Sequence, residues 1–106
     1  MRTKLNLGMK LTEADASRNK AKIEWEQAKD AYELEKIMEF ERIEKKGVNE
    51  KTCSRLVSKA RLTPGTPLNK LWRKYREASA LFCNERDRAA GLKRLYYDSD
   101  ELGQGG

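Results

Sequence analysis

The stretch from Glu13 to Lys46 contains neither glycine nor proline, and this absence limits the fold more than any other feature of the chain. Without either helix breaker, we expect one helix of about 34 residues, which at 1.5 Å per residue is ~50 Å long. Gly47 follows Lys45 and Lys46, as expected where cations occupy the last helical turn and a glycine follows it. The sequence therefore predicts a long helix over about 13–46.

A second long amphipathic stretch runs from Thr66 to Tyr97. Thr66 is a suitable N-cap, and Pro67 occupies the first helical position, where its missing N–H costs nothing. This predicts a helix over about 67–97. Its apolar residues recur at spacings of three, four and seven and so share one face, which contains Leu68, Leu71, Trp72, Tyr75, Ala78, Phe82, Ala89 and Tyr96.

A short helix is predicted between the two long ones, over about 49–62. Val48 and Asn49 provide an apolar staple and an N-cap. The apolar side of this helix has the spacing i, i+3, i+4, i+7 and consists of Cys53, Leu56, Val57 and Ala60. A turn containing Pro64 and Gly65 then leads into the last helix.

The two ends of the chain are predicted to lie outside the helices. Leucine and methionine alternate with polar residues from Met1 to Leu11, which fits a strand, but a lone strand has no partner. We therefore expect residues 1–11 to form an extended arm and Thr12 to cap the first helix. Residues 98–106 are acidic and rich in glycine, a composition that favours disorder.

These segments predict an all-α fold, an elongated antiparallel helical hairpin of two long helices joined by one short helix, with a single helical domain over 12–97. No apolar run approaches the ~18 residues of a membrane span, and Met1–Lys10 lacks the apolar block of a secretory signal. A cytoplasmic location, without a membrane partner, is therefore expected. Cys53 and Cys83 make no disulfide framework, and without histidine they make no ordinary zinc site.

The sequence lacks the usual signs of an enzyme. It has no histidine to act as a base near neutral pH, and no serine or cysteine stands at a strand-turn-helix elbow. Acidic pairs such as Glu33 and Glu35 are two residues apart on a helix, so they point in different directions. We expect no catalytic residues, no bound metal and no cofactor.

Charge is distributed unevenly along the chain. Residues 23–44 carry three basic and eight acidic side chains, whereas residues 45–97 carry fourteen basic and four acidic ones. Nucleic-acid binding needs lysine and arginine on one face, often with aromatic residues for base stacking, a role open to Trp72 and Tyr97. The alternative is ordinary: exposed helix faces are commonly basic, and aromatic residues at helical spacing are commonly core. The candidate phosphate contacts are Lys51, Arg55, Lys59, Arg61, Arg73, Arg86, Arg88, Lys93 and Arg94; Lys74 and Arg76 lie on the same basic side.

The first long helix is apolar on two faces. One stripe contains Ala14, Ala21, Trp25, Ala28 and Tyr32, and a second lies nearly opposite. Either both belong to one broad stripe inside a three-helix monomer, or one meets the last helix and the other meets a second subunit. In the second case the homo-oligomer interface contains Ile23, Ala31, Leu34, Ile37 and Met38.

The order of these segments resembles a family of small phage proteins. The stretches "LTEADASRNKAKIEWEQAKDAYELEKIMEFERI", "GVNEKTCSRLVSKA" and "LNKLWRKYREASALFCNERDRAAGLKRLYYD" are similar to the helical hairpins of UvsY-type recombination mediators. This resemblance implies binding of single-stranded DNA, self-assembly and loading of a recombinase in the host cytoplasm. It implies DNA contacts at Glu50-Lys51-Thr52, Lys59, Arg86, Arg88, Lys93 and Arg94.

Three functional hypotheses follow. The first is a homo-oligomeric accessory protein that binds single-stranded nucleic acid. The second is a small inhibitor or adaptor that uses the same basic helix against an acidic host protein or a nucleic-acid-processing protein. The acidic block from Glu24 to Glu44 is the feature that discriminates it, because an open acidic face can mimic phosphate. The third is a structural coiled-coil spacer.

Overall fold

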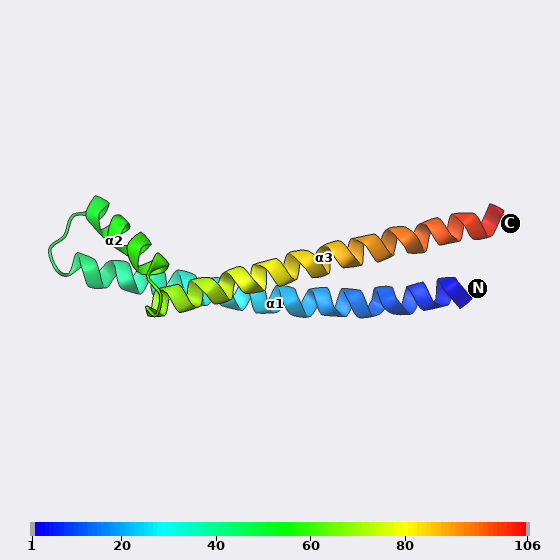
Figure 1. Cartoon of the computed structure of the whole chain (residues 1–106), viewed down its shortest axis with the longest axis horizontal. Helices are drawn as coiled ribbons and strands as arrows, with labels where there is room; N and C mark the ends of the chain where they lie inside the picture. The colour runs from blue at the N-terminus through cyan, green and yellow to red at the C-terminus, as the bar shows by residue number, and fades with distance from the viewer. Residues whose placement is uncertain (1, 106) are drawn as a thin grey trace. The chain divides into compact units, whose positions relative to one another are not determined.

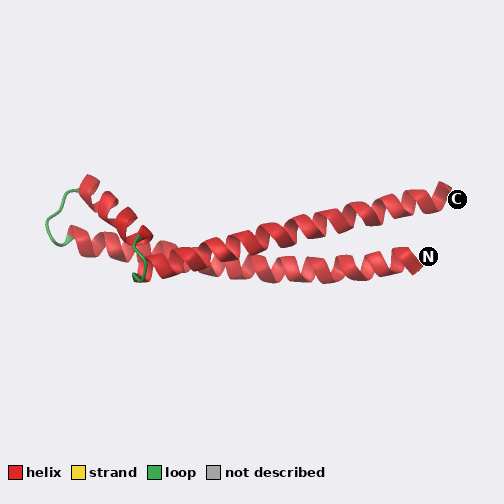
Figure 2. Ribbon diagram, in the orientation of Figure 1, coloured by secondary structure: helices red, strands yellow, loops and turns green. Residues whose placement is uncertain are grey.

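Three helices account for most of the chain. The computed structural model describes the backbone of residues 2–105 and the side chains of residues 4–98. The helices are α1 (Arg2–Glu44), α2 (Glu50–Leu62) and α3 (Pro67–Gly105), joined by two short loops (Figures 1 and 2). The described backbone contains no strand, which confirms the predicted all-α fold. None of the helices, over the part of the chain that is described, is long and apolar enough to cross a membrane.

The helices pack into two compact units where the sequence predicts one domain. The central unit consists of Glu24–Ala78, and the terminal unit combines the residues up to Ile23 with those from Ser79 onward. In the central unit the rings of Tyr32 and Tyr75 stack with their centres 5.7 Å apart. In the terminal unit the Lys4 ammonium lies over the ring of Tyr96. Within each unit α1 and α3 therefore run side by side in opposite directions, as predicted for a helical hairpin (Figure 1).

The core of the central unit receives side chains from all three helices. Leu68 and Cys53 are its largest fully buried side chains. Because α2 fills the space beside α1 and α3, this unit can bury larger residues than a two-helix pair. The buried cluster consists of Tyr32, Ile43, Cys53, Val57 and Leu68, with Phe40, Val48, Ala60, Leu71, Trp72 and Tyr75 packed around it.

The terminal unit has a narrower contact made of small residues. Ala14 and Ala21 on α1 and Ala89 on α3 are almost fully buried. Their methyl groups allow two helix backbones to approach closely, and the ring of Tyr96 comes within 3.5 Å of the position a Cβ would take at Gly8. Of the first stripe predicted on α1, Ala14, Ala21, Ala28 and Tyr32 are buried and Trp25 is half-buried.

The ends of the helices follow the capping residues of the sequence. Gly47 has a φ of 80°, in the left-handed region that favours glycine, and its N–H bonds to the carbonyl of Glu44. The Asn49 side chain accepts a hydrogen bond from the N–H of Thr52 at 2.9 Å, as an N-cap does. The Thr66 hydroxyl likewise accepts from the N–H of Asn69 at 3.1 Å. The caps predicted at Gly47, Asn49 and Thr66 are therefore confirmed, and α1 ends at Glu44 because residues 45–47 form its closing turn.

The corner between α2 and α3 is held by side chains that bind the last carbonyls of α2. The Thr63 hydroxyl donates to the Lys59 carbonyl at 2.6 Å, and the Thr66 hydroxyl donates to the Ala60 carbonyl at 2.6 Å. Asn69, which is buried, donates from Nδ2 to the carbonyl of Arg61 at 2.7 Å. Carbonyl groups that a helix end leaves without partners are thus satisfied by neutral donors.

The predicted extended arm over 1–11 is wrong, because α1 begins at Arg2. A helix satisfies its own backbone hydrogen bonds, which a lone strand cannot do. The alternating apolar residues also fit a helix: Leu7 and Leu11, four residues apart, are half-buried, whereas Leu5 and Met9 point outward and are exposed. Thr12 is not an N-cap either, since its hydroxyl donates to the carbonyl of Gly8 inside α1.

The predicted disorder after Tyr97 is also not observed over the described backbone, where α3 continues to Gly105. Once α3 has formed, each added residue gains a helical hydrogen bond, and one glycine at position 91 lowers the helical preference without ending the helix. Met1 and Gly106, which belong to the predicted arm and tail, lie outside the described residues.

Candidate nucleic-acid interface

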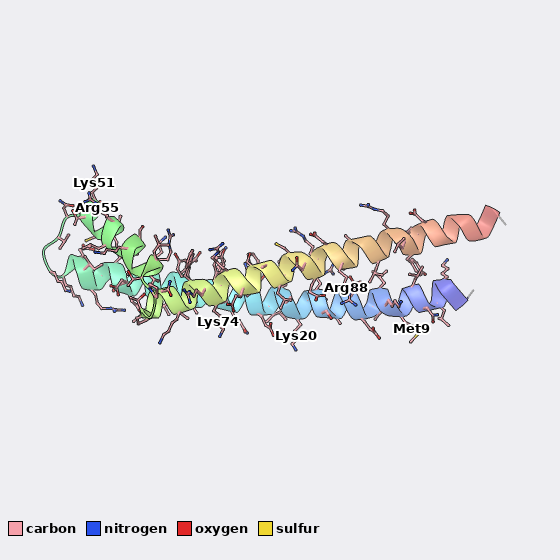
Figure 3. All side chains as sticks on the ribbon, in the orientation of Figure 1. Met9, Lys20, Lys51, Arg55, Lys74 and Arg88 are labelled. Carbon is pink, nitrogen blue, oxygen red and sulfur yellow. The ribbon has the colours of Figure 1, made fainter. Side chains whose placement is uncertain are left out.

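Three cations line the outer side of α2. Lys51, Arg55 and Lys59 are four residues apart, so they lie along one side of the helix with about 6 Å of axial rise between neighbours. All three are exposed, and Lys51 and Arg55 project from α2 on the side away from α1 (Figure 3). We call these three residues the α2 basic face. All three are predicted phosphate contacts, and a single helix brings them together.

The buried side of α2 fixes the direction of this face. Cys53 and Val57 are inside the core of the central unit, and the thiol of Cys53 donates to the carbonyl of Val48 at 3.4 Å. Turning the helix would expose these residues, so the basic side is held toward solvent. Among the side chains that the structure describes, no carboxylate forms an ion pair with any member of the α2 basic face. Its three charges are therefore available to an anion.

A second group of predicted contacts lies in the terminal unit, on the exposed side of α3. Arg86 and Arg88 each have a carboxylate nearby, at 3.6 Å from Asp87 and 3.7 Å from Glu85. Such exposed pairs are weak, but they reduce the local positive potential. Lys93 and Arg94 are exposed and make no ion pair with another described side chain. The predicted site residues are thus divided between two units, and the α2 basic face is the group in which no member is paired with a described carboxylate.

The remaining predicted contacts surround Trp72 in the central unit. Arg73 is exposed, but Arg61 is half-buried and places its guanidinium carbon 5.5 Å from the centre of the Trp72 ring. Arg76 also lies over this ring, at 4.9 Å. Two guanidinium groups therefore lie over the Trp72 ring, which is one of the two predicted candidates for base stacking. Tyr97, more than half exposed and edge-on to Tyr96, has a more open ring.

The residues predicted to form a subunit contact are all exposed in the single chain. They are Ile23 in the terminal unit and Ala31, Leu34, Ile37 and Met38 in the central unit. A large apolar side chain such as Leu34, 60% exposed, leaves most of its surface in water. Next to Leu34, an open groove of about 490 Å³ lies between α1 and α2. It is lined by Glu33, Lys36, Ile37, Phe40, Ser54, Val57 and Ser58.

The acidic block of α1 is largely open to solvent. Within it, Glu35 and Glu39 are half-buried and both bind the Arg42 guanidinium, at 2.6 and 2.8 Å. The exposed acids of the block are Glu24, Glu26, Asp30, Glu33, Glu41 and Glu44. The acidic charge therefore surrounds the exposed apolar residues of the same helix.

The described side chains do not assemble a metal site. No group of three or more cysteine, aspartate or glutamate residues is arranged to hold an ion within the described part of the chain. Cys53 and Cys83 are free thiols, the first buried and the second half-buried. Comparison of this chain with protein-family models, with curated proteins and with solved structures finds no match.

Proposed function

We propose that this protein is an accessory protein that binds single-stranded nucleic acid through the α2 basic face. The observation that carries the proposal is the alignment of Lys51, Arg55 and Lys59 on one exposed side of a helix, with no described carboxylate paired to them. When exposed, unpaired cations neutralise phosphates, the counterions of the nucleic acid are released, and this release drives binding. The resemblance to phage recombination mediators supports a role in loading a recombinase in the cytoplasm of an infected cell.

A single strand suits this surface better than a duplex. Half of α2 is packed into the core of the central unit, so only its outer side, with the α2 basic face, is open to a strand. A flexible single strand can follow this short row of cations, and Arg73 in the same unit offers a further contact.

Binding of labelled oligonucleotides of equal length, one single-stranded and one duplex, tests this preference at 50 mM salt. We expect the single strand to bind more tightly and its binding to saturate. Equal affinity for both would contradict the proposed strand preference, and no binding of either would remove nucleic acid as a partner. The mass of the protein in solution is recorded in the same buffer.

Self-association through the outer apolar side of α1 is the second part of the proposal. Leu34, Ile37 and Met38 expose 45–60% of their surface at helical positions i, i+3 and i+4, which is the pattern of an unpaired helix face. A small chain of this kind can gain buried apolar area by pairing with a copy of itself.

Replacing Leu34 and Ile37 with glutamate is expected to reduce the solution mass from several subunits to that of the 12.3 kDa chain. Each carboxylate would have to be buried in the subunit contact. Leu81→Glu is the matched control, because Leu81 is 45% exposed in α3 of the terminal unit and outside the proposed contact. A wild-type mass of one chain, or an equal effect of the control, would contradict this interface.

An inhibitor or adaptor that binds a basic partner protein is the second candidate. The observation that favours it is the open acidic block around Leu34 and Ile37, since acidic groups around apolar residues match a basic amphipathic helix. Saturable binding of a basic amphipathic peptide, with no binding of oligonucleotides at 50 mM salt, would favour this candidate over the first.

A further inference from the structure

Two arginine side chains of the central unit converge on one tryptophan. Arg61 comes from the end of α2 and Arg76 from α3, and each guanidinium carbon lies within 5.5 Å of the centre of the Trp72 ring. A cation over an indole ring is attracted by its negative face. One arginine over a tryptophan ring is ordinary, but here two guanidinium groups lie over the same ring.

No acidic side chain balances these charges. Among the described residues, neither Arg61 nor Arg76 forms an ion pair, although Arg42 in the same unit binds two carboxylates. Arg61 is half-buried, where solvent screens its charge less. Its Nε is also shielded from solvent and has no hydrogen-bond partner in the described part of the chain. The cluster thus has positive charge that no described carboxylate offsets.

Capping of α2 does not explain this arrangement. Arginine near a helix C-terminus often serves to satisfy the last carbonyl groups. Here the carbonyls of Lys59, Ala60 and Arg61 already accept hydrogen bonds from Thr63, Thr66 and Asn69, as described above. The donors of the two guanidinium groups remain available for another acceptor.

We propose that Arg61 and Arg76, held on Trp72, form a binding site for a phosphate monoester. The planar guanidinium group matches two phosphate oxygens at once, and stacking on an indole reduces the conformational freedom that is lost on binding. Two positive charges without a paired carboxylate match a phosphate that carries a charge of about −1.5 to −2 at pH 7. The phosphate can belong to the end of a nucleic-acid strand or to a free small molecule.

The site is separate from the α2 basic face and does not depend on it. Trp72 reports on it directly once Trp25, the other tryptophan, is replaced by phenylalanine. In the Trp25→Phe chain, we expect inorganic phosphate to change the tryptophan emission in a saturable way, with no change on adding chloride to the same ionic strength. Far-UV circular dichroism confirms that each variant retains its helices.

Arg61→Gln and Arg76→Gln, each in the Trp25→Phe chain, are both expected to abolish this response. Lys74→Gln is the matched control, because it removes one exposed cation of α3, whereas the cations over the ring are Arg61 and Arg76. The control should keep the wild-type response. Loss of the response in the control, or its persistence in both arginine variants, would overturn the assignment.

Two oligonucleotides of one sequence, with and without a 5′-phosphate, then distinguish the two sources of phosphate. At least tenfold tighter binding of the phosphorylated strand, lost in Arg76→Gln, identifies a strand end as the ligand. Equal binding of the two strands, together with a saturable response to inorganic phosphate, identifies a free phosphate monoester. No saturable response to inorganic phosphate or to the phosphorylated strand overturns the inference, even where the α2 basic face still binds oligonucleotides.

Discussion

Replacing Leu68 with alanine is expected to lower the free energy of unfolding by about 2–5 kcal/mol, because it leaves a cavity where all three helices meet. Leu68 is 1% exposed and is one of the two largest fully buried side chains. A loss of this size is a large part of the ~5–15 kcal/mol that stabilises an ordinary domain. Urea denaturation followed by far-UV circular dichroism should show a lower midpoint for the variant than for the wild-type chain. The central unit is expected to unfold before the terminal unit.

Leu62→Ala provides the control for this change. The same atoms are removed, but Leu62 is 59% exposed at the end of α2, so the expected loss is within about 0.5 kcal/mol. Equal losses for the two variants would contradict the packing described for the central unit.

Replacing Lys51, Arg55 and Lys59 together with glutamine is expected to weaken binding of a single-stranded oligonucleotide by about 10²- to 10³-fold at 50 mM salt. Each lost phosphate contact removes roughly 0.7 released counterion from the binding equilibrium of a single strand. Glutamine is uncharged, unbranched and close to lysine and arginine in helix propensity, so α2 should remain folded. Fluorescence anisotropy of a labelled strand measures the change.

A variant with the same loss of net charge separates a local contact from a general electrostatic effect. Lys10, Lys20 and Lys22 are exposed on α1 in the terminal unit, outside the α2 basic face. Their replacement with glutamine should weaken binding by less than about fivefold. A loss as large as that of the α2 variant would show that net charge, rather than the row of cations on α2, determines affinity.

The helices could be predicted because their ends are encoded locally. Gly47, Asn49 and Thr66 each act on backbone groups within a few residues, so the sequence alone indicates where α1 ends and where α2 and α3 begin. The arm before Thr12 was a wrong prediction because alternating leucines also fit positions four apart on a helix. The choice between a strand and a helix depends on α3, whose Tyr96 lies beside Lys4 and Gly8 only after the terminal unit has folded.

The candidate sites differ in how far the sequence defines them. Lys51, Arg55 and Lys59 are on one helix, so their common direction follows from the spacing. The cluster at Trp72 could not be predicted in this form, because it joins two helices through long arginine side chains whose positions depend on tertiary packing. The role of Asn69 was missed for the same reason, since its partner is eight residues away across a turn.

The salt dependence of single-strand binding by the unmodified chain tests the central claim most directly. The affinity is measured from 50 to 200 mM salt, and its logarithm is plotted against the logarithm of the salt concentration. Three phosphate contacts on the α2 basic face predict a slope of about −2, and additional contacts make it steeper. A slope near zero, or no binding at 50 mM salt, would contradict a phosphate-binding function for this face.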